Sequence, residues 1–74
     1  MIAEHSLAVL NSDLPQAGLH AGDVGTVVCV HKAGSAYEVE FIGGDGGTIA
    51  LLTLEAAEVR PLAGGELLHA RKRD

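Results

Sequence analysis

The chain is short of cysteine and of aromatic side chains, and each shortage excludes a class of protein. Its single cysteine, Cys29, cannot form a disulfide within the chain, which excludes the disulfide-stapled scaffolds of small secreted domains. A lone cysteine is instead typical of a reducing cytoplasm. With one Tyr, one Phe and no Trp, the chain also lacks the side chains that line grooves for proline-rich peptides.

Long apolar stretches are missing too. Runs such as Ile49–Leu52 reach four residues, whereas a membrane-spanning helix needs about 20. Residues 1–5 contain no basic side chain of Lys or Arg, so they do not resemble a signal peptide. We therefore predict a soluble, cytoplasmic protein that does not contact a membrane.

Positive charge is scarce up to Ala70. Lys32 and Arg60 stand there against nine carboxylates: Glu4, Asp13, Asp23, Glu38, Glu40, Asp45, Glu55, Glu58 and Glu66. Residues 71–73 then form a short basic tail, which we interpret as solubilising. Because an acidic body repels a phosphate backbone, the charge argues against a nucleic-acid-binding groove.

Glycine, by contrast, is plentiful, and its ten copies divide the chain into short segments of alternating polarity. This pattern predicts strands at 6–11, 24–32, 36–42, 48–54 and 59–62, with one 3₁₀ turn at 55–58. Residues 36–42 give the clearest pattern, since three apolar side chains alternate with two glutamates. The expected core consists of Val9, Val28, Val30, Tyr37, Val39, Phe41, Leu52 and Leu54. A chain of 74 residues forms one domain, and five short strands favour a small barrel, because closure removes exposed sheet edges.

Two parts of the chain resemble known families. Residues 19–28, with Gly22-Asp23 before Val24-Gly25-Thr26-Val27, resemble the opening of many SH3-like barrels, among them the KOW-type domains of ribosomal and transcription proteins. Residues 6–62 are similar to a family of short bacterial proteins known only as a domain of unknown function. The matching segments are Asp13-Leu14-Pro15, Gly22–Val28, Ala36–Phe41, Thr48–Leu51 and Val59–Leu62. The resemblance implies a fold and no activity. We therefore predict an all-β, SH3-like five-stranded barrel over residues 1–63, followed by an extra C-terminal strand and basic tail over 64–74.

Groups that could perform chemistry are few. Cys29 and His31 lie two apart on one predicted strand and form the only ligand-like pair, without a His-x-x-x-His or Cys-x-x-Cys spacing. As nucleophile and base, the same pair lacks a third group that would orient the histidine. Glu38 and Glu40 share a face, which is typical of a solvated strand. We predict no catalytic residue, no cofactor and no metal.

The segment 48–54 is a candidate contact surface, because it is apolar on both faces. A barrel interior can bury Ala50, Leu52 and Leu54, which leaves Ile49 and Leu51 outside. The extra strand adds Leu67 and Leu68, and an unpaired strand tends to pair with a neighbour. We predict a homo-oligomer with Ile49, Leu51, Leu67 and Leu68 at its interface. The alternative is that residues 64–74 fold back on their own barrel.

The connection over residues 12–21 is a second candidate surface. It carries Leu14 and Leu19, two large apolar side chains among turn residues. We expect them to be partly exposed, or to pack as a lip beside the barrel, and to contribute to a partner site.

These patterns lead to one main functional hypothesis, a non-catalytic protein-interaction module that self-associates. One alternative is a nucleic-acid-binding, KOW-like domain. Another is an accessory subunit or small-molecule binder, which would require a concave apolar pocket that the core does not fill.

Overall fold

The computed structural model describes residues 1–64, whose regular structure consists of strands and 3₁₀ turns. The strands are β1 (Leu7–Leu10), β2 (Val24–His31), β3 (Ala36–Ile42), β4 (Thr48–Glu55) and β5 (Val59–Pro61), with 3₁₀ turns at Pro15–Ala17, Lys32–Gly34 and Ala56–Glu58. Within residues 1–64, no helix has the length and hydrophobicity to cross a membrane. The predicted all-β class is confirmed. The predicted C-terminal strand, with Leu67 and Leu68, lies outside the described residues.

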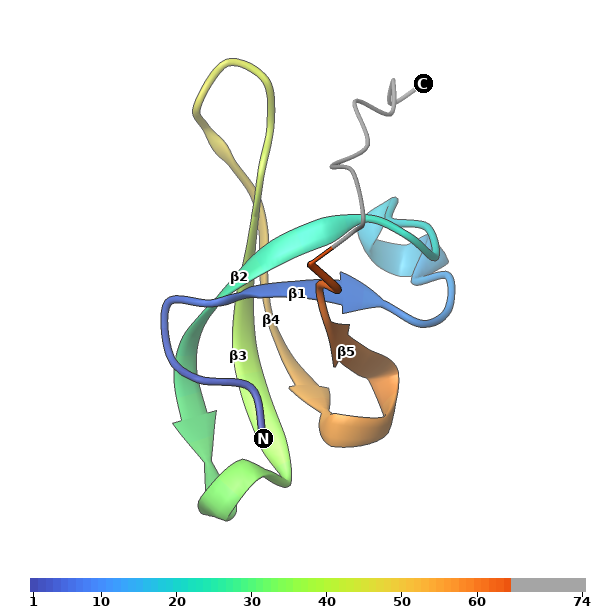
Figure 1. Cartoon of the computed structure of the whole chain (residues 1–74). Coiled ribbons are helices and arrows are strands. Elements are labelled where there is room, and N and C mark those ends of the chain that lie inside the picture. The colour runs from blue at the N-terminus through green and yellow to red at the C-terminus, as the bar shows by residue number, and fades with distance from the viewer. Residues whose placement is uncertain (65–74) are drawn as a thin grey trace.

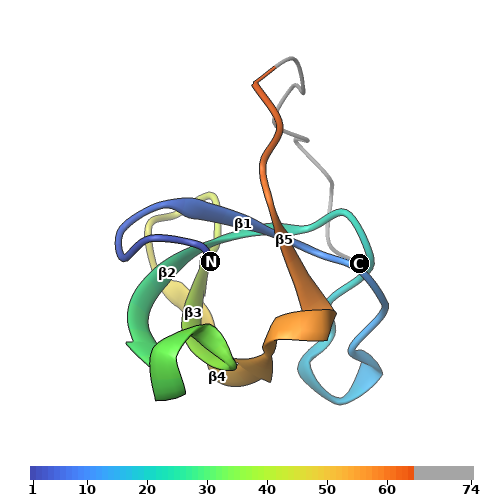
Figure 2. The ribbon, with the colours of Figure 1, turned by 60° about the horizontal axis from the view of Figure 1, so that its bottom comes forward.

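The five strands form one antiparallel sheet in the order β4-β3-β2-β1-β5. Strands β1 to β4 follow one another as a meander, and the turn at Ala56–Glu58 then carries the chain to β5, which pairs with β1 (Figures 1 and 2). Strand β2 is long and serves two neighbours: Val24–Thr26 pair with β1, and Thr26–His31 pair with β3. In Figure 1, β1 crosses the direction of β3 and β4, so the sheet bends around a single core.

The sheet is not closed into a barrel, in contrast to the prediction. Strands β4 and β5 are its two edges, and within residues 1–64 each pairs with one strand only. Strand β5 has three residues, and all three pair with β1. Leu54 and Val59, from the two edge strands, instead meet in the core cluster. Side-chain packing therefore joins the edges where backbone hydrogen bonds do not.

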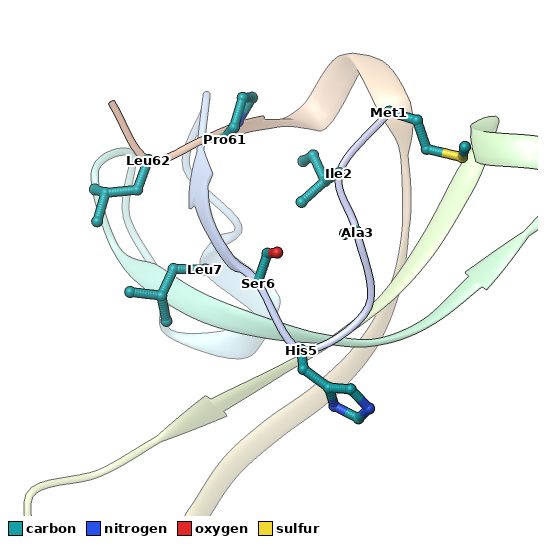
Figure 3. A pocket seen from close by; sticks show the side chains of 8 residues that line it. All are labelled: Met1, Ile2, Ala3, His5, Ser6, Leu7, Pro61 and Leu62. Carbon is teal, nitrogen blue, oxygen red and sulfur yellow. The ribbon is translucent and has the colours of Figure 1, made fainter. Parts of the chain in front are cut away.

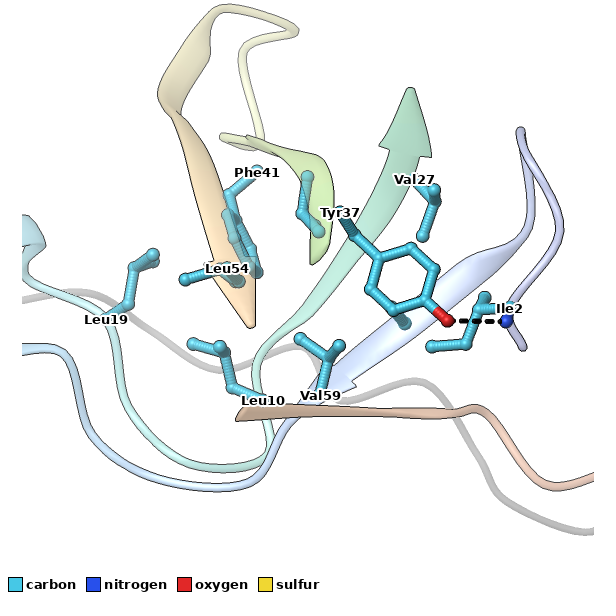
Figure 4. Close-up of a cluster of buried hydrophobic side chains, with 10 residues drawn as sticks. Ile2, Leu10, Leu19, Val27, Tyr37, Phe41, Leu54 and Val59 are labelled. Atoms are coloured by element: carbon cyan, nitrogen blue, oxygen red, sulfur yellow. Dashed lines mark hydrogen bonds between the residues drawn. The ribbon is translucent and has the colours of Figure 1, made fainter. Parts of the chain in front are cut away.

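The core contains side chains from all five strands, from the segment before β1 and from the connection between β1 and β2 (Figure 4). Its buried members are Ile2, Ala8, Leu10, Leu19, Val27, Tyr37, Val39, Phe41, Leu54 and Val59. The predicted members Tyr37, Val39, Phe41 and Leu54 are confirmed, while Val30 and Leu52 are partly buried against the cluster. Ile2 comes from an N-terminal arm, and its backbone N–H donates to the Tyr37 hydroxyl at 3.0 Å. This bond gives the buried phenol a partner, as buried tyrosines usually require.

One predicted core residue, Val28, is wrong, and the reason is the register of β2. Val27 is fully buried and Val28 is not, because a β-bulge in β2 lies between Val27 and Cys29 and leaves Val28 without a partner on β3. In β2, before the bulge, the alternation is therefore shifted by one residue from the prediction. The predicted core residue Val9 is confirmed as buried, at 2% exposure, and its neighbours Ala8 and Leu10 are buried as well.

Candidate functional site

The outer face of β2, β3 and β4 brings together most of the residues considered for function. Two rows of paired residues cross this face. In one row, Glu40 of β3 lies between Thr26 of β2 and Leu51 of β4; in the other, Glu38 lies between Cys29 and Thr53. The side chains of Val27, Tyr37 and Val39 point the other way and are buried. The outer face therefore has a polar part on β2 and β3 and an apolar part on β4.

The polar part contains Cys29, His31 and Glu38, which we call the polar cluster. From His31 opposite Ala36, the register continues without a break to Cys29 opposite Glu38, so His31 and Cys29 lie two residues apart on the same face. The His31 ring nitrogen Nε2 lies 2.9 Å from Glu38 Oε2, and one ligand atom from each of the three residues lies within 4.8 Å of the other two. The side chains of His31 and Glu38 are 40% and 34% exposed. The cluster is thus open to water on one side.

The sequence revealed two of these three residues. The pair Cys29 and His31 is visible as an i, i+2 spacing, but Glu38 belongs to another strand. Pairing from the predicted turn at 33–35 would place Cys29 opposite Val39. The actual connection has one residue more, because Lys32 and Ala33 both adopt positive φ, 50° and 55°, and His31 therefore pairs with Ala36. Had the four-residue connection been predicted, the pairing would have placed Glu38 opposite Cys29 and so identified the third residue of the polar cluster.

The apolar part consists of Ile42 at the end of β3, beside Ile49 and Leu51 on β4, and we call the two β4 residues the β4 strip. These side chains are 54%, 37% and 55% exposed. Among residues 1–64, strand β4 is an edge of the sheet, and no other strand of this part of the chain pairs with its outer side. The structure thus places Ile49 and Leu51 at the surface, as expected. Their role in an interface stays a prediction, and Leu67 and Leu68 lie outside the described residues.

The connection between β1 and β2 is more ordered than its composition indicates. Leu14 and Leu19 form an isolated β-bridge, with backbone N–H groups bonded to each other's carbonyls at 2.9 and 3.1 Å. Leu19 is buried in the core, and Leu14 packs against it. The sequence predicts these leucines to be partly exposed or to pack beside the barrel. Both pack against the bent sheet, and partial exposure is wrong for Leu19, which is buried. Leu14 is the leucine of this loop that stays accessible to a partner.

An open groove lies between the N-terminal arm and the end of β5 (Figure 3). Its lining is mostly apolar and consists of Met1, Ile2, Ala3, His5, Ser6, Leu7, Pro61 and Leu62. The groove is more open than enclosed, and Ile2 at its side belongs to the core. It therefore differs from the enclosed apolar pocket that a small-molecule binder usually requires.

Comparison with known proteins identifies the family to which this domain belongs. A family model described as a domain of unknown function, DUF4926, matches residues 4–61. The chain therefore belongs to the DUF4926 family. The comparisons with curated proteins and with solved structures gave no match.

Proposed function

We propose that this DUF4926 protein is a non-catalytic interaction module with an SH3-like architecture, and that it self-associates through β4. Two features support the architecture. Strand β5, the last one within residues 1–64, pairs with β1, and a single 3₁₀ turn at Ala56–Glu58 precedes it. The strongly bent sheet encloses one core, as in small barrels that manage their edges by curling.

The observation that carries self-association is the β4 strip on an open edge. Strand β4 has eight residues, contains no proline, and carries a charge only at its last residue, Glu55. Natural edge strands are usually shortened, charged or interrupted by proline to prevent pairing. An edge without these devices, beside exposed Ile49 and Leu51, suits pairing with another strand.

We propose that the β4 edge binds a second copy of the chain. Pairing of β4 with β4 of a second chain would be isologous, so each copy would cover the other's Leu51. The chain also supplies two further leucines, Leu67 and Leu68, which could extend the apolar contact. In a cytoplasmic setting such as the sequence predicts, Cys29 would stay a free thiol, so the association does not depend on a disulfide.

Substitution of Leu51 by Ser is expected to weaken the oligomer without unfolding the chain. Burying a leucine contributes about 1.5–3 kcal/mol, so its loss should raise the dissociation constant at least about tenfold. Sedimentation equilibrium at tens of micromolar protein measures this change. Leu7→Ser is the matched control, since Leu7 is an exposed leucine on β1.

Two outcomes decide the proposal. A full chain that stays monomeric at these concentrations contradicts self-association. Removal of residues 64–74 tests the contribution of Leu67 and Leu68; an oligomer that survives both this removal and Leu51→Ser is held together by another surface.

A further inference from the structure

The polar cluster has a chemical composition that neither the family nor the proposed function explains. It combines a thiol, an imidazole and a carboxylate from two adjacent strands. Each of these groups is a common ligand of Zn²⁺ in proteins. A thiolate and an imidazole together select a borderline-soft ion such as Zn²⁺ over Mg²⁺ and Ca²⁺, which prefer oxygen ligands.

The spacing of the cluster suits one ion. In tetrahedral zinc sites, with metal–ligand bonds of about 2.0–2.3 Å, neighbouring ligand atoms lie about 3.3–3.6 Å apart. The three ligand atoms of Cys29, His31 and Glu38 lie within 4.8 Å of one another, and the contact between His31 and Glu38 is 2.9 Å. Side-chain adjustments of about 1 Å would therefore bring all three atoms to coordination distance.

The backbone around the cluster holds the side chains in place. Sites on strands are more precise than sites on loops, and all three residues lie on β2 or β3. The connection after His31 sets the register that pairs Cys29 with Glu38, and the bulge at Val28 lies directly beside Cys29; bulges are over-represented next to functional sites. On the same face, the carboxylate of Glu40 accepts a hydrogen bond from the Thr48 hydroxyl of β4 at 2.8 Å. Glu40 is therefore not part of the polar cluster.

We propose that Cys29, His31 and Glu38 bind one divalent transition-metal ion, Zn²⁺ in first place, on the outer face of β2 and β3. Three protein ligands leave a fourth position for water or for a donor from another molecule. The partial exposure of His31 and Glu38 is compatible with such an open position.

Titration of the reduced, metal-free full chain with Co²⁺ and then Zn²⁺ tests the proposal. We expect one ion per chain, a thiolate-to-cobalt charge-transfer band, and loss of the band when Zn²⁺ displaces Co²⁺. Cys29→Ser should abolish the band. Removing a residue that merely orients a ligand lowers metal affinity about 10–100-fold, so Glu38→Gln should lower zinc affinity by at least about tenfold. Glu40→Gln is the matched control on the same strand and face, and should leave the affinity unchanged.

A second measurement does not depend on variants. Amide resonances of the unchanged chain should shift on addition of Zn²⁺ around Cys29, His31 and Glu38, and those around His5 and His20 should not. The absence of saturable binding at stoichiometric zinc would overturn the proposal. Equal zinc affinity of the Cys29→Ser variant and the unchanged chain would overturn it too. Repeating the titration with Leu51→Ser separates metal binding from self-association.

Discussion

Phe41→Ala is expected to remove most of the free energy of unfolding of this domain. Phe41 is 2% exposed and belongs to the core cluster, and truncation of a buried Phe to Ala costs about 3–5 kcal/mol. Small domains have total stabilities of about 5–15 kcal/mol, and one of this size lies near the lower end. Thermal or urea unfolding monitored by circular dichroism measures the loss.

The neighbouring residue provides the control for this prediction. Ile42 follows Phe41 on β3 but points outward and is 54% exposed. Ile42→Ala should change the free energy of unfolding by no more than about 0.5 kcal/mol, as is usual for surface substitutions. If the two variants have equal melting temperatures, the register of β3 described above is incorrect.

The Gly25→Ala variant is expected to be destabilised by about 2–3 kcal/mol, although the change adds a single methyl group. A Cβ atom at Gly25 would lie 2.7 Å from Val39 Cγ1 and 2.9 Å from both the Glu40 carbonyl oxygen and Phe41 Cε1. The carbonyl oxygen is part of the backbone of β3 and cannot turn away, so β2 and β3 would have to separate. Overpacking of this kind typically costs about 1–3 kcal/mol.

Gly44 is the matched glycine for comparison. It lies in the turn between β3 and β4, and a Cβ atom there would meet nothing within 4 Å. Gly44→Ala should leave the melting temperature unchanged or raise it slightly, because alanine reduces the freedom of the unfolded chain. A Gly25→Ala variant as stable as Gly44→Ala would show that β3 does not approach Gly25 closely.

Gly25 also shows how a correct local interpretation can miss its tertiary cause. A glycine inside a strand pattern indicates a bulge, a bend or a close approach, and the Gly-x-Val segment matched the expected barrel opening. In the structure the bulge is at Val28, and Gly25 is required by close packing against β3. The distance between two strands is not encoded in either strand alone.

The candidate site, like Gly25, was predicted only in part from the sequence. Ile49 and Leu51 could be placed outside from the composition of residues 48–54, because one sheet face can bury only half of an apolar strand. The third member of the polar cluster could not be predicted, since Glu38 lies opposite Cys29 only because of the longer connection after His31. Leu19 was expected in a loop, but its bridge to Leu14 directs it into the core.

By itself, the sequence determined the all-β class and the positions of the strands, because period-two alternation and glycine turns act within a few residues of the chain. It also determined the strongly acidic body and the absence of an internal disulfide, which follow from composition alone. Only the tertiary structure decided which side chains meet. Register depends on single-residue differences in turns and bulges, and a shift of one residue exchanges the two faces of a strand. The bulge placed Val27 in the core instead of Val28, and the longer connection after His31 placed Cys29 opposite Glu38.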